Sequence, residues 1–396
     1  MTYDFDNLPD RRGTDSVKWS AYAEDVLPLW VADMDFPSPE PVIRALKERI
    51  EHGVFGYPAS AGNNPQSAPR LRQAIIDHMA EHYNCDVQAE DILFLAGVVT
   101  GINLACHTLA EPGGGVLIQT PVYMPFLSAP GHAGMQRQEM ELTYCPDGSY
   151  TIDWETFESA ITGQTRLFIL CNPHNPVGRV FTRAELERMA EICLRKGVVI
   201  CSDEIHCDLI YHGHRHIPMA SLDPEIAQNT ITFIAPSKTY NLAGLECSIA
   251  IIPNHALRKK FLHSGKGLLS WVNLMGMVAA QAAYEEGQEW LDQLLVYLEA
   301  NRDFLSNYVK SELAGIRMAS PEGTYLAWLD CRAAGLTGTP YDFFLKQARV
   351  ALNDGAAFGK GGEGFVRMNF GCPRATLEEA LERMKHALLL QGSCTE

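Results

Sequence analysis

The sequence has few basic residues for its size and no long apolar run. Its 396 residues include 32 Lys and Arg against 48 Asp and Glu, which gives a formal net charge of −16. Phosphate backbones repel a chain this acidic, so we expect it to bind neither nucleic acid nor a membrane. No apolar stretch approaches the roughly 20 residues that a membrane-spanning helix needs. The polar first residues, MTYDFDNLPDRRGT, are unlike a secretory signal, and we expect a cytoplasmic protein.

Residues spaced to bind a metal are also missing. The 11 cysteines, from Cys85 to Cys394, include no Cys-x-x-Cys pair. We therefore expect free thiols in a reducing compartment, with neither a disulfide framework nor a zinc site. His212, His214 and His216 alternate in YHGHRH, but no acidic or thiol partner stands at ligand spacing. We interpret this stretch as a solvated turn, and we predict no metal.

Short apolar strands that alternate with helical patterns fill the middle of the chain. Thr182 and Glu185 form a capping-box pattern at the start of one helix. The alternation predicts a mainly parallel sheet covered on both faces, with functional residues beyond the carboxyl ends of its strands. The predicted strands are 92–97, 115–120, 166–171, 198–204, 231–235 and 247–253, and the clearest helices are 98–110 and 182–197.

The pattern changes after about residue 287. Leucines from Leu291 to Leu298 keep helical spacing within a long helix predicted over about 287–313. The irregular first forty or so residues are expected to wrap onto this part of the chain. We predict a large domain over residues 46–286 and a small α+β domain built from residues 1–45 plus 287–396. The other elements predicted in the small domain are strands at 323–330 and 364–371 and helices near 340–349 and from about 375.

A glycine-rich stretch, Gly359 to Gly364, fits the pattern G-x-G-x-x-G. A dinucleotide site needs this motif between a strand and a helix, in that order. Here the stretch precedes a predicted strand, so we interpret it as a flexible loop.

Two of the predicted strand ends carry groups suited to an anion and to a polar ring. The turn Gly97–Gly101 opens a helix whose free N–H groups attract anions, and Thr100 adds a hydroxyl. In CNPHNPVG, two Asn-Pro steps share one turn. Because the prolines fix the backbone, the amides of Asn172 and Asn175 are expected to point at a ligand.

Two further strand ends carry charged residues. Asp203 follows the strand VVIC, and a buried carboxylate there would be costly without a cationic partner. Lys238 follows Ser237 at the end of ITFIA, where a solvated lysine would be out of place.

Together these groups meet the demands of one cofactor, pyridoxal 5'-phosphate (PLP). Its phosphate would lie near Val99 and Thr100, helped by Ser237. An aspartate would keep the ring nitrogen protonated, and an asparagine would bond the ring hydroxyl. A lysine would form a Schiff base with the aldehyde.

At this point the chain resembles a known family, the fold-type-I PLP-dependent enzymes of the class I/II aminotransferase group. The motifs that carry the resemblance are N-P-x-N-P-x-G, S-D-E-x-H, S-K-T and F-V-R-x-N, in that order. RRGTDSVKW, VADMDFPSP, HGVFGYP, TYLAWLD and FVRMNFGCPR are similar to the cystathionine β-lyase, or carbon–sulfur lyase, branch. The resemblance implies an α/β, three-layer PLP-dependent transferase-like fold, with a large, mixed, mainly parallel sheet domain and a smaller α+β domain. It also implies a small-molecule amino-acid substrate and a homodimer with shared active sites.

The resemblance further implies a role for each matching residue. Lys238 would carry the cofactor and act as acid and base, Asp203 would pair with the ring nitrogen, and Tyr123 would stack on the ring. Asn175 would contact the ring hydroxyl, with His206 near the same edge. The remaining cofactor contacts would be Val98, Val99, Thr100, Asn172, Ser237 and Tyr57, the last reaching in from the other subunit.

For the substrate, the resemblance implies four residues. Arg367 would bind the α-carboxylate through a bidentate pair, and Tyr57, Asn175 and Asp35 would lie near the rest of the substrate.

One position departs from the family pattern. Many relatives have an arginine eight residues after the lysine, where it contacts the cofactor phosphate, but this chain has Glu246. A carboxylate facing a phosphate dianion would be repelled. Either Glu246 points away or the phosphate end is arranged differently, and the departure fits the β-lyase branch better than a typical aminotransferase.

The sequence therefore favours a lyase that splits cystathionine or a related cysteine S-conjugate into a thiol, pyruvate and ammonia. Lys238 would remove the Cα proton before the Cβ–S bond breaks. An aminotransferase that acts on an L-amino acid is the first alternative. A regulatory protein that keeps the fold is the second. The sequence leaves open which sulfur compound is used.

Overall fold

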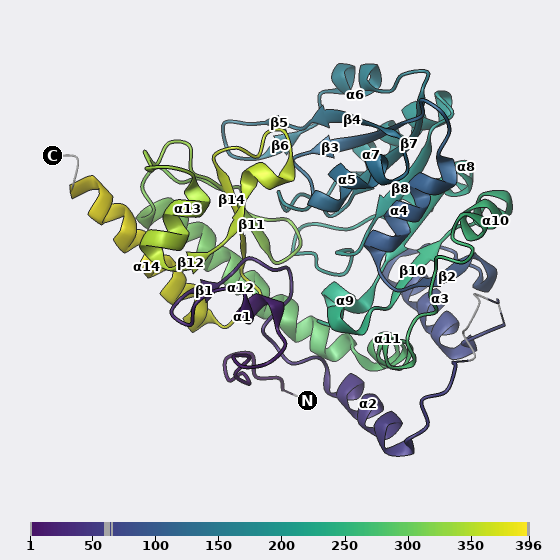
Figure 1. Ribbon diagram of the computed structural model, residues 1–396, viewed down its shortest axis with the longest axis horizontal. Coiled ribbons are helices and arrows are strands. Elements are labelled where there is room, and N and C mark those ends of the chain that lie inside the picture. Colours follow the sequence, from purple (N-terminus) through teal and green to yellow (C-terminus); the bar gives the residue numbers. More distant parts are fainter. Residues whose placement is uncertain (1, 59–63, 65, 394–396) are drawn as a thin grey trace.

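The computed structural model describes residues 2–58, 64 and 66–393. They form a large sheet covered by helices, beside a smaller group of strands and helices built from both ends of the chain (Figure 1). Within these residues no helix is both long and apolar enough to cross a membrane.

Seven strands form the large sheet, in the order β2-β10-β9-β8-β7-β3-β4. Only β10 runs antiparallel to its neighbours, so the carboxyl ends of the other six lie at one edge. The predicted mixed, mainly parallel sheet is confirmed. The strands are β2 (Ile92–Leu95), β3 (Gly115–Thr120), β4 (Gln136–Glu141), β7 (Thr165–Cys171), β8 (Val199–Asp203), β9 (Thr230–Ile234) and β10 (Ser248–Ile251).

Helices cover both faces of this sheet because alternate strand residues point to opposite sides. Leu93 and Leu95 of β2 pack with α4 (Val98–Leu109), whereas Ile92 and Phe94 pack with α3 (Pro69–Tyr83). The predicted capping box at Thr182 and Glu185 is present at the start of α7. The α4 face also holds α5 (Met124–His132) and α10 (His255–Ser264); the α3 face holds α6 (Trp154–Ala160), α7 (Arg183–Arg195), α8 (Pro224–Gln228) and α11 (Leu274–Glu286).

The smaller group is built around a three-stranded antiparallel sheet. Its strands are β11 (Leu326–Asp330), β14 (Phe365–Asn369) and β13 (Asn353–Asp354), with β14 in the centre. Its helices are α12 (Gln288–Glu312), α13 (Pro340–Phe343) and α14 (Arg374–Ser393), and a π-helical turn over 344–348 continues α13. Elsewhere the chain forms the 13-residue helix α2 (Glu40–His52) and the short elements α1 (Val17–Ser20), α9 (Pro236–Thr239), β5 (Thr143–Tyr144) and β6 (Tyr150–Thr151).

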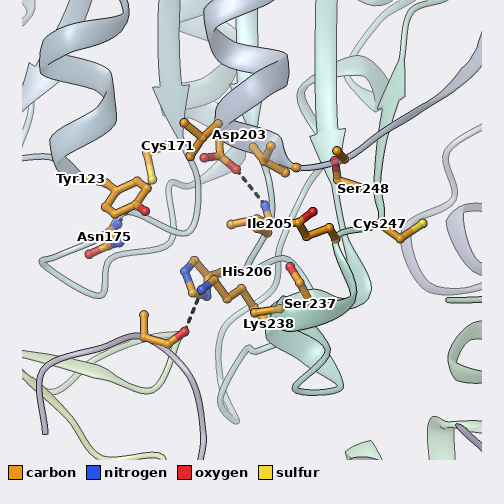
Figure 2. A pocket seen from close by; sticks show the side chains of 17 residues that line it. Tyr123, Cys171, Asn175, Asp203, Ile205, His206, Ser237, Lys238, Cys247 and Ser248 are labelled. Atoms are coloured by element: carbon orange, nitrogen blue, oxygen red, sulfur yellow. Dashed lines mark hydrogen bonds between the residues drawn. The ribbon is translucent and has the colours of Figure 1, made fainter. Parts of the chain in front are cut away.

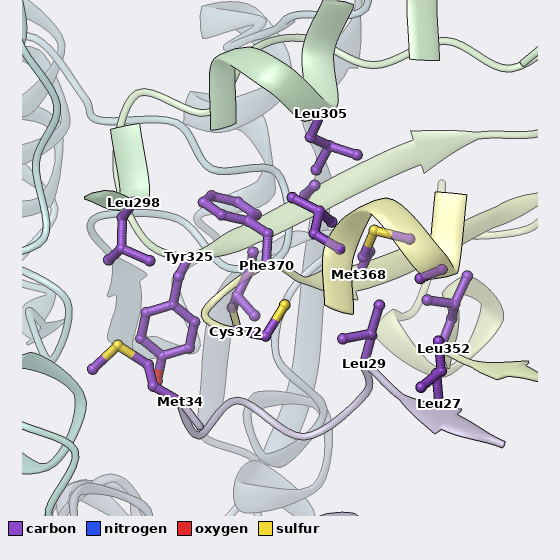
Figure 3. Packing of buried hydrophobic residues seen from close by; sticks show 14 of the residues in the cluster. Leu27, Leu29, Met34, Leu298, Leu305, Tyr325, Leu352, Met368, Phe370 and Cys372 are labelled. Carbon is purple, nitrogen blue, oxygen red and sulfur yellow. The ribbon is translucent and has the colours of Figure 1, made fainter. Parts of the chain in front are cut away.

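The first residues of the chain pack against its last third, as the sequence predicted. β1 (Leu27–Pro28) pairs in parallel with β12 (Val350–Ala351). Figure 3 shows Leu29 and Met34 in the same hydrophobic cluster as Leu298 of α12. This packing brings the segment around residues 30–36 close to the edge of the large sheet. The domain boundaries at residues 46 and 286 stay a prediction.

Two residues of α12 give a test of this packing. Leu294 has no exposed surface, whereas Val296 on the same helix is 72% exposed. We expect L294A to lower the free energy of unfolding by about 2–5 kcal/mol, because it leaves a cavity in the core. V296A should change it by less than about 0.5 kcal/mol. Urea unfolding followed by circular dichroism measures both, and equal losses would contradict the assigned burial.

Candidate active site

One cavity lies at the carboxyl edge of the large sheet. Its volume is about 310 Å³. The ends of β7 and β8, the start of α4 and the turn after β9 all open onto it. Figure 2 shows the side chains that surround it. The lining residues are Ala32, Ala96, Gly97, Val98, Val99, Tyr123, Cys171, Asn175, Asp203, Ile205, His206, Ser237, Lys238, Ala243, Glu246, Cys247 and Ser248.

Lys238 lies in α9, the single helical turn that follows β9. Its Nζ donates a hydrogen bond to the carbonyl oxygen of Ala32 at 2.7 Å. Burial, together with the nearby charge of Arg367, lowers the pKa of Lys238 to about 8 against the opposing charges of Asp33 and Asp203. The amine is therefore neutral in a much larger fraction of molecules near neutral pH than that of an ordinary lysine.

Asp203 ends β8 and is 4% exposed. Its Oδ1 accepts a hydrogen bond from the backbone N–H of Ile205 at 3.1 Å. Burial, together with the charge of Glu204, raises the pKa of Asp203 to about 7 against the opposing effects of the Ile205 N–H and the charge of Lys238. No ion pair of Asp203 exists among the described residues. A cation placed beside this carboxylate would restore its ionised form.

Arg367 and Asn175 meet beside the cavity. Arg367 comes from β14 and is 3% exposed. Its Nη1 donates to Oδ1 of Asn175 at 3.0 Å, and its Nη2 donates to the carbonyl oxygen of Trp30 at 2.9 Å and to Oδ1 of Asn353 at 2.5 Å. Its Nε is buried and has no hydrogen-bond partner among the described residues. Burial lowers the pKa of Arg367 to about 10, so the guanidinium stays charged and can bind a carboxylate.

Two rings face the same cavity. Tyr123 precedes α5, and burial raises the pKa of its hydroxyl. The ring of His206 is buried, and its Nδ1 has no hydrogen-bond partner in the part of the chain that the structure describes. Burial holds the pKa of His206 well below its usual value, helped by the charges of Lys238 and Arg367, so the ring is neutral.

One end of the cavity is suited to an anion. Gly97 precedes α4, and no side chain caps this helix start. Val98, Val99 and Ser237 line the cavity here, together with Ser248. Free backbone N–H groups and hydroxyls provide hydrogen bonds for a phosphate.

Glu246 also lines this cavity. It has a left-handed backbone conformation with φ of +48°, and its side chain is exposed. We find no ion pair of its carboxylate among the residues that the structure describes. The sequence left open how Glu246 lies relative to the cofactor site. The structure places Glu246 in the lining of the cavity.

Besides Arg367, which contacts the lining residue Asn175 but does not itself line the cavity, four other predicted site residues lie outside it. Tyr57 is 87% exposed and stacks edge-on against Trp271, with ring centres 5.0 Å apart. Thr100 is exposed on α4, beyond the lining residues. Asn172 is 1% exposed, and its Oδ1 accepts from the backbone N–H of Phe181 at 3.1 Å, so it anchors its own turn.

Asp35 is the fourth of these residues. Its Oδ1 accepts hydrogen bonds from Arg11 at 2.7 Å and Trp19 at 2.9 Å, and its Oδ2 accepts from Lys18 at 2.8 Å. Both carboxylate oxygens are engaged in this buried cluster, and Asp35 does not line the cavity; its predicted contact with a substrate stays a prediction.

The histidine stretch needs a correction. His212 and His214 are exposed, as a solvated turn requires, but His216 is only 2% exposed and its Nε2 lies 2.9 Å from Oε2 of Glu204. The prediction was wrong for His216, because Glu204 follows β8 into the interior and needs a partner there. The described residues contain no group of His, Cys, Asp and Glu able to hold a metal. The stretch from Gly359 to Gly364 is a loop before β14, as predicted.

Sequence reasoning missed two features of the cavity. Ser248 starts the antiparallel strand β10, so its place at this edge depends on a strand direction that the motifs do not reveal. The segment around Ala32 contributes backbone carbonyls, which accept hydrogen bonds from Lys238, Tyr325 and Arg367. Every residue type has a backbone carbonyl, so no sequence motif could have indicated this contribution.

The chain is similar to one protein family and to several individual proteins and solved structures. Residues 24–384 match the family model described as aminotransferase class I and II. The chain is 41% identical to cystathionine β-lyase PatB of Bacillus subtilis (strain 168), over 97% of this chain and 99% of that protein. Cystathionine β-lyase of Corynebacterium glutamicum is 33% identical, over 97% of this chain and all of that protein (100%).

Solved structures agree with these relatives. The crystal structure of cystalysin from Treponema denticola, which contains a PLP cofactor, matches with a TM-score of 0.92 at 34% identity, over 99% of this chain and 100% of that chain. The PLP-bound C–S lyase from Staphylococcus hominis matches with a TM-score of 0.91 at 32% identity, over 98% of this chain and 99% of that chain. The predicted three-layer fold is confirmed, and the chain belongs to the class I and II aminotransferase family, within its branch of cystathionine β-lyases and carbon–sulfur lyases.

Proposed function

We propose that this protein is a PLP-dependent carbon–sulfur β-lyase. Its substrate is cystathionine or a related cysteine S-conjugate, and its products are a thiol, pyruvate and ammonia. The observation that carries the proposal is the meeting of Lys238, Asp203 and Asn175 at one cavity, with Arg367 bonded to Asn175. The similarity to cystathionine β-lyases supports the reaction class.

The residues around the cavity fit PLP. Asp203 is a buried carboxylate without a cation, and the protonated ring nitrogen of PLP would supply one. The unpartnered Nδ1 of His206 is a further buried polar atom beside the same space. A volume of about 310 Å³ lies within the usual range of small-molecule sites, roughly 300–1,000 Å³. Val98, Val99 and Ser237 would hold the phosphate.

When bound, PLP supplies an electron-accepting ring that stabilises negative charge at the substrate Cα. Asp203 would keep the ring nitrogen protonated, and Tyr123 would pack on the ring face. Lys238 would accept the Cα proton at Nζ, and its lowered pKa of about 8 makes the required neutral amine available. With the amine protonated, Lys238 can then act as an acid in later steps.

Arg367 would orient the substrate. Its guanidinium is held by Trp30, Asn175 and Asn353, which fixes the plane of its fork before the substrate arrives. Such a preorganised guanidinium binds the α-carboxylate through two parallel hydrogen bonds, and the substrate would replace the bonds at Nη2. Fixing the carboxylate positions the Cα–H bond relative to Lys238.

The proposal includes a homodimer in which Tyr57 of the partner subunit completes each site. Phe55, Tyr57 and Trp271 line one surface hollow, and their exposed fractions are 60%, 87% and 51%. Exposed aromatic side chains gathered in this way are typical of a protein–protein interface. Because Tyr57 lies outside the cavity of its own chain, a role in a partner's cavity explains its exposure.

The proposal also places the protein in the cytoplasm. All the described cysteines are free thiols. Unpaired cysteines in this number are typical of a reducing compartment.

A lyase and an aminotransferase can be distinguished by the products that they form. We expect purified protein loaded with PLP to release pyruvate from cystathionine with no keto acid present. K238A should lose about 10³-fold or more of this activity, because it removes the proposed base. Lactate dehydrogenase coupled to pyruvate measures the rate. Amino transfer that requires a keto acid, without pyruvate release, would instead identify an aminotransferase.

The pKa of Lys238 predicts how PLP attachment depends on pH. Only the neutral amine reacts, so the attachment rate should rise about tenfold per pH unit below the pKa and level off above it. The attachment rate should level off near pH 8, because the pKa of Lys238 is lowered to about 8. Visible absorbance after mixing cofactor-free protein with PLP over a pH series measures the rate. A rise that continues to about pH 10, as for an ordinary lysine, would show that the amine is not desolvated.

Glu246 gives a test of the phosphate end. We expect E246Q to tighten PLP binding about three- to tenfold, because it removes a like charge near the phosphate at an exposed site. Fluorescence titration of cofactor-free protein measures the dissociation constant. E24Q is the matched control, since Glu24 is exposed and lies outside the cavity. Weaker binding in E246Q would mean that Glu246 works through a bound cation.

A further inference from the structure

Another buried carboxylate, Asp208, lies behind the turn that carries Lys238. Asp208 follows β8, and its side chain is 5% exposed. Its Oδ1 lies 2.8 Å from Nε2 of His78 and also accepts a hydrogen bond from the hydroxyl of Tyr83. Its Oδ2 accepts a hydrogen bond from Oγ1 of Thr239 at 2.8 Å. None of these four residues lines the cavity, so the proposed mechanism leaves this network without a function.

The network is anchored to α3 and reaches α9. His78 and Tyr83 belong to α3, and Thr239 is the last residue of α9, directly after Lys238. Thr239 has no exposed surface. Its hydroxyl therefore ties the lysine-bearing turn to a helix on one face of the large sheet.

A helical turn of four residues does not hold its own geometry. Isolated helices this short are unstable in water, so contacts from outside must fix α9. The hydrogen bond between Thr239 and Asp208 is such a contact, and it lies one residue from Lys238. Displacing it would rotate the backbone of α9 and move Nζ of Lys238 away from the carbonyl of Ala32.

The hydrogen bond from Thr239 to Asp208 is stronger than one between neutral groups, because its acceptor is a charged carboxylate. Burial opposes ionisation of Asp208, but the charge of His78 and the hydrogen bonds from His78, Tyr83 and Thr239 outweigh it and hold the pKa of Asp208 well below its usual value. Burial likewise lowers the pKa of His78, but Asp208 more than compensates and raises it. Both shifts favour the charged forms of this buried pair. The other titratable groups that act on it are His82, Glu81, Cys207, Tyr240 and Tyr284.

We propose that Asp208 is a positioning residue that acts on Lys238 through Thr239. The Asp208–His78 pair fixes the α9 turn, and this fixes the direction of the lysine side chain toward the cavity. The inference rests on the proposed function, because it concerns the reactivity of Lys238 with PLP and substrate.

The test compares two substitutions at Thr239. T239V keeps the shape of the side chain and removes the hydroxyl, whereas T239S keeps the hydroxyl. We expect T239V to slow PLP attachment to Lys238 at least tenfold, to shift the pH midpoint of the visible absorption band and to lower kcat with KM nearly unchanged. T239S should restore all three. D208N should resemble T239V. Stopped-flow absorbance on cofactor-free protein gives the attachment rate independently of turnover.

T182V is the matched control for stability. Thr182 forms a capping box with Glu185 at the start of α7, which is remote in sequence from α9. Removing the Thr182 hydroxyl should therefore lower the melting temperature and leave PLP attachment unchanged. If T239V attaches PLP at the rate of T239S and keeps the same absorption midpoint, the positioning role is wrong, even if T239V is less stable. If wild-type protein gains no visible absorption with PLP, the proposed function itself fails.

Discussion

Everything in this site depends on an amine and a carboxylate that are buried at the same cavity. Burial disfavours the charged form of each group, and so the pKa of Lys238 falls to about 8 while that of Asp203 rises to about 7. Neither group has an oppositely charged side chain within salt-bridge distance among the described residues. Such a site is poised for a ligand that carries an electrophilic carbon toward the amine and a cationic nitrogen toward the carboxylate. PLP has both, and it neutralises the two burial penalties at once.

The sheet explains why these groups meet. β7, β8 and β9 are adjacent and parallel, so Cys171, Asp203 and the turn after Ile234 end at one edge. The smaller unit closes this edge from the other side with Arg367 on β14. The segment around residues 30–32 lies between the two units and accepts hydrogen bonds from both Lys238 and Arg367. Two buried carboxylates behind the edge, Glu204 and Asp208, are each paired with a histidine on the side away from the cavity.

The sequence predicted the parts of this site that depend on strand order. Lys238, Asp203 and Asn175 stand at the ends of clearly apolar strands, and parallel strands bring such ends together. The sequence could not place residues whose surroundings are contributed by other segments of the folded chain. Asp35 matches a family motif, yet the fold surrounds it with Arg11, Lys18 and Trp19. His216 looked exposed because its buried partner, Glu204, is twelve residues away.

The covalent link at Lys238 is the central claim, and trapping it is the most direct test. PLP-loaded protein would be treated with borohydride, digested and mapped by mass spectrometry. We predict one modified peptide, with the reduced cofactor attached to the side chain of Lys238. Cofactor found on another lysine, or an unmodified Lys238 in protein that had visible colour before reduction, would contradict the account.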